Sequence, residues 1–219
     1  MLQILNLKFQ YPNGAFQLNL PKLQIKQGAK VALIGSSGCG KTTLLQLISG
    51  IKSPACGNIQ VNDVCIEQLS ESQRRQFRIT QVGFIFQNFE LLDYLTVMDN
   101  ILHPYRLSPA LNLTTEVRQR AFTLAQQVAV DNKLNRSINS LSQGEKQRVA
   151  ICRALLPQPT MLLADEATGN LDPVNKQRVL DILLNYVDHY SATLLAATHD
   201  YELLDRFDHV VEFGQFSEI

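Results

Sequence analysis

Short apolar segments separated by polar turns occupy the first third of the chain, a pattern that predicts strands. The strands expected there span residues 2–9, 16–20, 30–34, 58–61 and 64–66. Later runs are apolar throughout and too short for helices, which predicts strands buried on both faces. These runs lie at residues 81–86, 161–164 and 192–197.

The middle of the chain follows a helical period instead. Residues 96–130 read as helical, with Thr96 and Asp99 spaced as an N-cap and its N3 partner. Within residues 116–130 the apolar side chains share one helical face, at Val117, Ala121, Leu124, Ala125 and Val128. Further helices are expected at residues 42–49, which Gly50 ends, and after the N-cap and proline of Asp172-Pro173.

Apolar strands that alternate with helices favour an α/β fold with a mainly parallel sheet covered on both faces. We interpret the helical stretch as a lobe inserted into that α/β core. The chain has 219 residues, of which 45% are apolar, so it can form one compact domain or a core with a smaller lobe.

The balance of charges, the spacing of the cysteines and the apolar runs limit which partners and which cellular location we expect for the chain. Twenty basic residues balance twenty acidic ones without a basic stripe, so we expect no nucleic-acid partner. The four cysteines, Cys39, Cys56, Cys65 and Cys152, lack zinc spacing and are typical of reduced thiols in the cytoplasm. The N-terminus lacks a signal-peptide pattern, and no apolar run approaches the roughly 18 residues of a membrane span. Any membrane role therefore requires a partner.

A glycine-rich loop carries the most specific chemical signal. Gly35-Ser36-Ser37-Gly38-Cys39-Gly40-Lys41-Thr42 matches GxxxxGK[ST] between a predicted strand and a predicted helix. Backbone N–H groups of such a loop converge on phosphate oxygens, and the helix N-terminus adds partial positive charge. We expect Lys41 to reach the β- and γ-phosphates of a nucleoside triphosphate, Thr42 to bind Mg²⁺, and Thr43 to join the nucleotide contacts. Cys39 is either a reactive thiol beside a helix N-terminus or an inert packing residue.

Two adjacent carboxylates follow the apolar strand at residues 161–164. Asp165 and Glu166 therefore lie at the edge where parallel sheets bind ligands. We expect Asp165 to hold Mg²⁺ and Glu166 to polarise the water that attacks the γ-phosphate. The glycine-rich loop alone fits kinases, GTPases and many motors, whereas Glu166 favours a hydrolase.

The string Leu141-Ser142-Gln143-Gly144-Glu145-Lys146-Gln147-Arg148 precedes the two carboxylates by one helix. Ser142 and Glu145 fit a capping box, so a helix start explains part of this string. With the glycine-rich loop and the paired acids, the sequence resembles the nucleotide-binding subunits of ABC transporters, which are P-loop NTPases. The chain departs from the LSGGQ-type signature at Gln143 and Glu145 and keeps Ser142 and Gly144.

The resemblance covers essentially the whole chain and implies further roles. The signature residues Ser142, Gln143, Gly144 and Glu145 contact ATP held by the other subunit of a dimer. Tyr11 matches the aromatic residue that stacks on adenine, with Phe9 as the alternative.

Three more elements of the family occur in order. Gln87 matches the glutamine that senses Mg²⁺ and links the core to the helical lobe, and His199 matches the switch histidine at the γ-phosphate. The loop Asn170-Leu171-Asp172 matches the one that communicates across the dimer. The other histidines, His103, His189 and His209, have no such match and are expected to be surface or packing residues.

The resemblance also implies an architecture and a partner. We expect a RecA-like core at about residues 1–90 and 141–219, an antiparallel β subdomain, and an inserted α-helical subdomain at about residues 91–140. The segments FQNFELLDYLTVMDNI and DEATGNLD look most like ATPases of lipoprotein-release and macrolide-export systems, which serve FtsX-like permeases. We therefore expect an ATPase on the cytoplasmic face of the plasma membrane that dimerises around Mg-ATP and drives a separate permease.

Two other readings compete with this one. A soluble ABC ATPase of DNA repair or translation is disfavoured because the chain has neither a long coiled coil nor a second cassette. A non-hydrolysing subunit is disfavoured by Glu166 and His199. If the transporter reading is correct, grooves beside Gln87 and residues 89–95 should receive a short helix of the permease.

Overall fold

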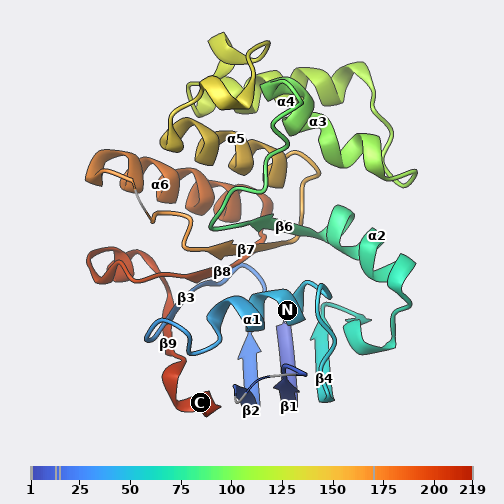
Figure 1. The fold of residues 1–219 in the computed structure, drawn as a ribbon, viewed down its shortest axis with the longest axis vertical. Coiled ribbons are helices and arrows are strands. Elements are labelled where there is room, and N and C mark those ends of the chain that lie inside the picture. The colour runs from blue at the N-terminus through green and yellow to red at the C-terminus, as the bar shows by residue number, and fades with distance from the viewer. Residues whose placement is uncertain (1, 13, 15, 170, 219) are drawn as a thin grey trace.

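The computed structural model describes residues 2–12, 14, 16–169 and 171–218. Its strands form two five-stranded sheets, and helix α1 (Lys41–Ile48) lies between them (Figure 1). The first sheet is antiparallel, with the order β10 (Ser217–Glu218), β2 (Gln17–Ile25), β1 (Leu2–Gln10), β4 (Cys56–Val61) and β5 (Val64–Cys65). The second sheet is parallel, with the order β6 (Val82–Ile85), β7 (Met161–Asp165), β8 (Thr193–Ala197), β3 (Lys30–Ile34) and β9 (His209–Glu212). The predicted α/β class with a parallel sheet is confirmed.

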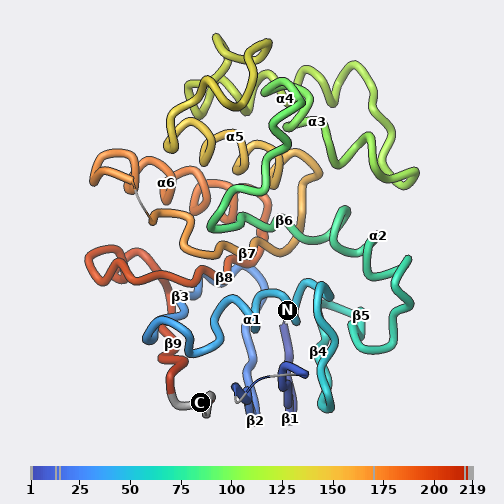
Figure 2. Tube along the Cα trace, viewed as in Figure 1, coloured from blue at the N-terminus to red at the C-terminus, as the bar shows by residue number. Residues whose placement is uncertain are grey.

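The other helices cover the parallel sheet and build the lobe above it (Figure 1). They are α2 (Glu71–Gln81), α3 (Val97–Leu107), α4 (Thr115–Gln127), α5 (Gln143–Leu155) and α6 (Pro173–Tyr190). Short 3-10 turns connect the elements at η1 (Ile66–Gln68), η2 (Asp131–Lys133), η3 (Ile138–Ser140), η4 (Tyr201–Arg206) and η5 (Gly214–Phe216). Figure 2 shows that the segments near both chain ends join the antiparallel sheet, where β1 and β10 flank β2.

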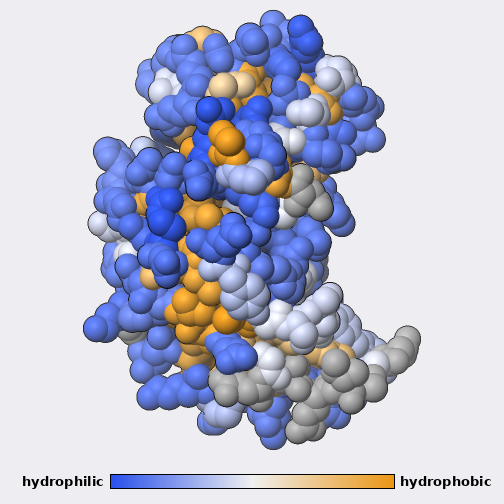
Figure 3. Space-filling view, turned by 90° about the vertical axis from the view of Figure 1, so that its left-hand side faces the viewer, coloured by the Kyte–Doolittle hydropathy of each residue, from blue (hydrophilic) through white to orange (hydrophobic). Residues whose placement is uncertain are grey.

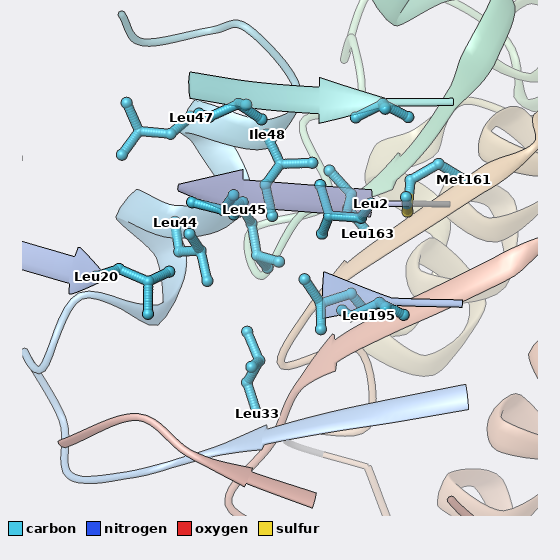
Figure 4. Close-up of a cluster of buried hydrophobic side chains, with 14 of the residues drawn as sticks. Leu2, Leu20, Leu33, Leu44, Leu45, Leu47, Ile48, Met161, Leu163 and Leu195 are labelled. Carbon is cyan, nitrogen blue, oxygen red and sulfur yellow. The ribbon is translucent and has the colours of Figure 1, made fainter. Parts of the chain in front are cut away.

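Strands β7 and β8 are buried along their whole length. Because side chains alternate across a strand, Leu163 and Leu195 pack on α1 and the antiparallel sheet (Figure 4). Leu162 and Leu194 point to the opposite face and pack with α5 and α6. Two hydrophobic clusters thus cover the two faces of the sheet, as the continuous apolar runs predicted.

A third hydrophobic cluster joins α3, α4 and α5. The single apolar face predicted within residues 116–130 is confirmed, since Val117, Ala121 and Ala125 of α4 are buried. The predicted helical stretch is two helices, however, and residues 108–114 separate α3 from α4. Thr96 is the N-cap of α3, where its hydroxyl accepts a hydrogen bond of 3.1 Å from the Asp99 N–H.

Several predicted boundaries were wrong. Gln81 ends helix α2 and does not belong to the strand β6, and Ile66 begins η1 where a strand was predicted. Strand β2 continues through Pro21 to Ile25. Proline has no N–H to donate to a neighbouring strand. It is tolerated at this position because Pro21 does not pair with Asn6 of β1, whose φ is 50°, while the residue pairs on either side are kept.

Strand β9 forms one edge of the parallel sheet and leaves Val210 45% exposed. Figure 3 views the side of the molecule that lies to the left in Figure 1, where a largely polar surface surrounds an apolar area in the middle and lower part. Within the described ranges, no helix combines the length and apolar character that a membrane crossing requires.

Candidate nucleotide-binding site

The glycine-rich loop connects β3 to α1. Gly38 and Gly40 have φ angles of 82° and 98°, in the left-handed region that glycine adopts without a steric penalty. A Cβ atom at Gly40 would also meet Cζ of Phe16 at 2.5 Å, so a larger residue there would strain the backbone and displace the Phe16 ring. Gly40 is the N-cap of α1, and no side chain caps this end. The first N–H groups of α1 are therefore free of a side-chain cap and suited to bind an anion.

Lys41 brings a positive charge to the same loop. Its Nζ donates hydrogen bonds to the carbonyl oxygens of Gly35 at 2.8 Å and Ser36 at 3.0 Å, and lies 3.8 Å from Sγ of Cys39. Cys39 is only 2% exposed and belongs to the first hydrophobic cluster. A reagent from solvent can therefore reach this thiol only if the loop opens.

Thr42 and Asp165 bring two oxygen ligands together. The Thr42 hydroxyl donates a 3.1 Å hydrogen bond to Oδ1 of Asp165, which ends β7 and is 4% exposed. Burial raises the pKa of Asp165, as does the nearby Glu166 carboxylate, although the Thr42 hydrogen bond and Lys41 act in the opposite direction. A hydroxyl and a carboxylate are oxygen donors of the kind that Mg²⁺ takes, so this pair fits that ion.

Glu166 connects the ends of three neighbouring strands. Its Oε2 accepts a 2.8 Å hydrogen bond from Nε2 of Gln87, which follows β6, and its Oε1 lies 2.8 Å from Nε2 of His199, which follows β8. Its φ of 50° is unusual for a residue with a side chain, and such strain occurs often at active sites. The N–H of Glu166 donates to the Ala197 carbonyl at 3.0 Å, which ties the strained residue to β8.

These groups surround a cavity of about 540 Å³. It is lined by Tyr11, Phe16, Ser37, Gly38, Gly40, Lys41, Thr42, Thr43, Gln87, Glu166 and His199. The other predicted loop and metal residues are in contact with this lining: Gly35, Ser36 and Cys39 contact Lys41, and Asp165 contacts Thr42. The cavity can hold a polyphosphate beside the Glu166 carboxylate, which contacts the Gln87 amide and the His199 imidazole.

Tyr11 lines the cavity and its hydroxyl lies 3.0 Å from Oγ1 of Thr43. Phe9, the alternative, packs partly buried against the first hydrophobic cluster. Phe16 also lines the cavity, although it was not predicted as a site residue, and its ring centroid lies 6.0 Å from that of Tyr11. The sequence contains a signal for this role of Phe16, because Tyr11 and Phe16 are aromatic residues that flank the turn at Pro12.

The signature residues begin helix α5, away from the cavity of their own chain. Ser142 and Glu145 form a capping box, with the Glu145 N–H donating to the Ser142 hydroxyl at 3.3 Å and the Ser142 N–H donating to Oε2 of Glu145 at 2.9 Å. A hydrogen bond from Lys133 lowers the pKa of Glu145. Ser142 and Gln143 are exposed, and Gly144 is partly exposed. One chain therefore presents the loop and the signature as separate surfaces.

The predicted communication loop is only partly described, because Asn170 lies outside the described residues. Asp172 caps α6 by accepting a 3.1 Å hydrogen bond from the Asn175 N–H. Sequence reasoning missed Asp200, which follows His199 and accepts hydrogen bonds of 2.7 Å from Thr168 and 2.5 Å from Lys176. Burial opposes ionisation of Asp200, but these two hydrogen bonds together with the charge of Lys176 lower its pKa.

Comparisons with known proteins place the chain in a family. A family profile described as ABC transporter matches residues 18–169, more than half of the chain. The chain is 37% identical over 214 residues to the "Macrolide export ATP-binding/permease protein MacB" of Rhodopirellula baltica, covering 96% of this chain and 31% of that protein. It is 36% identical over 204 residues to the "Lipoprotein-releasing system ATP-binding protein LolD" of Legionella pneumophila, covering 92% of this chain and 89% of the relative.

The fold agrees as well. The solved structure described as "Dimeric structure of a post-hydrolysis state of the ATP-binding cassette MJ0796 bound to ADP and Pi" matches with a TM-score of 0.89 and 28% identity, covering 100% of this chain and 98% of that chain. The chain therefore belongs to the ABC transporter family. Within that family it is an ATP-binding ATPase cassette, and the predicted resemblance to the lipoprotein-release and macrolide-export ATPases is confirmed.

Proposed function

We propose that this ATPase works as a dimer closed around two Mg-ATP molecules, and that it drives an FtsX-like permease from the cytoplasmic face of the membrane. The observation that carries the hydrolytic part is the contact of Gln87 and His199 with the two oxygens of Glu166 beside the glycine-rich loop. A carboxylate held in this way can orient and polarise an attacking water.

The polar residues in and beside the cavity then have distinct roles. Lys41 and the first N–H groups of α1 bind the phosphates, with Ser37, Thr42 and Thr43 beside them, and Tyr11 stacks on the base. Thr42, Asp165 and Gln87 hold Mg²⁺, which when bound neutralises charge on the phosphate oxygens. Glu166 is the general base, and His199 contacts the γ-phosphate.

The exposed signature supports the dimer. Ser142 and Gly144 lie at the start of α5, where the helix dipole favours an anion, yet the cavity of the same chain does not include them. In the proposed dimer each α5 end completes the cavity of the other subunit. ATP then favours the closed state because only that state offers it both surfaces.

A second groove supports the permease interaction. Its volume is about 280 Å³, and α2, β6, α3 and α5 contribute to its walls, which include Phe84, Phe86, Glu90, His103, Pro104, Leu107 and Arg153. Burial lowers the pKa of His103, and the charges of Arg153 and Arg106 lower it further, which favours a neutral imidazole. A short apolar helix of a permease fits such a surface, and the description of the MacB relative joins ATP-binding and permease in one protein.

We also propose a division of the chain into a core at about residues 1–90 and 141–219 and a helical subdomain at about residues 91–140. The third hydrophobic cluster supports the subdomain, because α3 and α4 bury their apolar faces there. The cluster also includes Val149 and Cys152 of α5, so the signature helix joins the two parts.

Copurification tests the proposed partner. Tagged chain isolated from solubilised membranes of its own host should carry a permease with a large periplasmic domain. Leu107→Glu, which puts a charge in the groove, should lose the permease and keep the ATPase activity of the isolated chain. The matched change Leu5→Glu, at an exposed leucine on β1, should retain the permease. Recovery of soluble partners alone would contradict the proposal.

A further inference from the structure

The backbone just after Gln87 is strained. Phe89 and Glu90 have φ angles of 63° and 50°, so two consecutive residues with side chains adopt the left-handed conformation. For such residues this conformation is unfavourable, and for a bulky residue such as phenylalanine it is rare. It persists only where surrounding contacts hold the backbone in place.

Backbone hydrogen bonds supply part of those contacts, since the Phe89 N–H donates to the Phe86 carbonyl oxygen at 3.1 Å and the Glu90 N–H to the Asn88 carbonyl oxygen at 2.7 Å. One side chain from the signature helix supplies the rest. Arg153, near the end of α5, donates from Nη2 to the Phe89 carbonyl oxygen at 2.5 Å and from Nη1 to the Glu90 carbonyl oxygen. Burial lowers the pKa of Arg153 to about 10, and the negative charge of Glu90 opposes that shift. The planar guanidinium presents its N–H groups in a fixed fork, so it can hold two successive carbonyl groups in one orientation.

This arrangement connects three parts of the protein. Arg153 lines the groove proposed for the permease, and the signature residue Ser142 is the N-cap of its helix. The turn that it holds begins two residues after Gln87, and Gln87 donates a 2.8 Å hydrogen bond to Glu166. The groove, the strained turn and the catalytic carboxylate are therefore joined through consecutive contacts.

We infer that Arg153 is a positioning residue, which keeps Phe89 and Glu90 in the left-handed turn and thereby keeps Gln87 on Glu166. A permease segment that enters the groove acts on hydrolysis through this side chain. The inference rests on the proposed function, because it assigns a regulator to the same hydrolytic site.

Arg153→Met tests the inference in the full chain, since it keeps most of the side-chain volume and removes the donors. We expect kcat for ATP to fall about tenfold, the effect of losing a hydrogen bond from a charged group. The KM for ATP should stay within about twofold, because the cavity that binds the nucleotide is unchanged. Arg206→Met is the matched control, since Arg206 pairs with Asp181 at 2.7 Å outside the groove, and it should leave both constants unchanged.

Rescue of kcat by a glycine at residue 90 distinguishes a role of Arg153 in positioning the backbone from a role in packing. Glycine adopts positive φ readily, so Glu90→Gly should restore kcat in the Arg153→Met background to within about threefold of Glu90→Gly alone. Glu90→Ala also removes the carboxylate but keeps a Cβ, and it should not rescue. Equal rescue by alanine and glycine, or none by either, would overturn the inference.

Arg153→Lys is a second variant in case the methionine protein does not fold. It keeps a positive charge but lacks the planar fork, and we expect a smaller fall in kcat that Glu90→Gly again reverses. If the wild-type chain hydrolyses ATP and both Arg153 variants match its kcat, this inference fails and the proposed function stands. If the wild-type chain shows no turnover, the proposed function itself fails.

Discussion

Lys41 and Asp165 are only 6% and 4% exposed, although both are ionisable. The Lys41 ammonium lies against the loop carbonyls, and the Asp165 carboxylate accepts a hydrogen bond from Thr42. An isolated charge is unfavourable in such buried surroundings, so these two side chains lower the stability of the chain without ligands. A bound phosphate and a bound cation would offset this loss.

Replacing the lysine should weaken nucleotide binding itself. Lys41→Ala removes the charge nearest the expected phosphate position, and we expect the dissociation constant for ATP to rise about 10- to 100-fold, the range for a charged hydrogen bond. A titration with a fluorescent ATP analogue measures this change. Lys22→Ala, at an exposed lysine on β2, is the control and should bind as the wild type does. Unchanged binding by Lys41→Ala would remove Lys41 from the site.

Asp165→Asn should raise the melting temperature of the nucleotide-free chain and at the same time lower its ATPase activity. Burial raises the pKa of Asp165, so between its ordinary and raised pKa the folded chain binds more protons than the unfolded chain. Wild-type stability therefore falls as pH rises through that window, and the asparagine protein avoids this loss. At neutral pH without nucleotide or Mg²⁺, the variant should melt at a higher temperature than the wild type yet hydrolyse little ATP. An equal or lower melting temperature would contradict the assigned effect of burial.

At the scale of elements, β7 and β8 matter most because they carry buried side chains on both faces. Leu195 is fully buried between the parallel sheet and α1. We expect Leu195→Ala to lower the free energy of unfolding by about 2–5 kcal/mol, the range for leucine-to-alanine changes in cores. Denaturant unfolding measures the loss. Leu5→Ala, at a leucine that is 42% exposed, should cost under about 1 kcal/mol, and equal losses would contradict this picture of the core.

The apolar strands and the helix N-caps could be predicted from the sequence because their signals are local. Helix α2 was missed although Ser70 and Gln73 form a capping box at its start. The mostly polar sequence of α2 buries only Phe77, so its apolar periodicity is weak. The full length of β2 was hidden as well, because the tolerance of Pro21 depends on the conformation of Asn6 in the neighbouring strand.

The site was predictable in part for the same reason. The glycine-rich loop and the pair Asp165 and Glu166 are contiguous in sequence, so their chemistry could be read directly. The contacts of Gln87 and His199 with Glu166 require the strand order β6-β7-β8, which the sequence alone does not establish without the family resemblance. Phe16 and Arg153 were missed because each acts through a contact with a residue distant in sequence.

At the scale of the whole molecule, the cavity and the signature lie on separate surfaces of one chain. A second copy of the chain resolves this separation if each signature completes the cavity of the other subunit. In the proposed dimer, ATP is therefore bound between two subunits, and hydrolysis by Glu166 allows them to separate.

Light scattering of Glu166→Gln with Mg-ATP tests this claim most directly. The amide keeps the shape of the carboxylate but is a poor base, so turnover should fall about 10²- to 10⁴-fold while ATP stays bound. The variant should then form a stable dimer, whereas Glu166→Gln combined with Ser142→Arg should remain monomeric, because the arginine blocks the signature. A Glu166→Gln chain that binds Mg-ATP and stays monomeric at every concentration would contradict the claim.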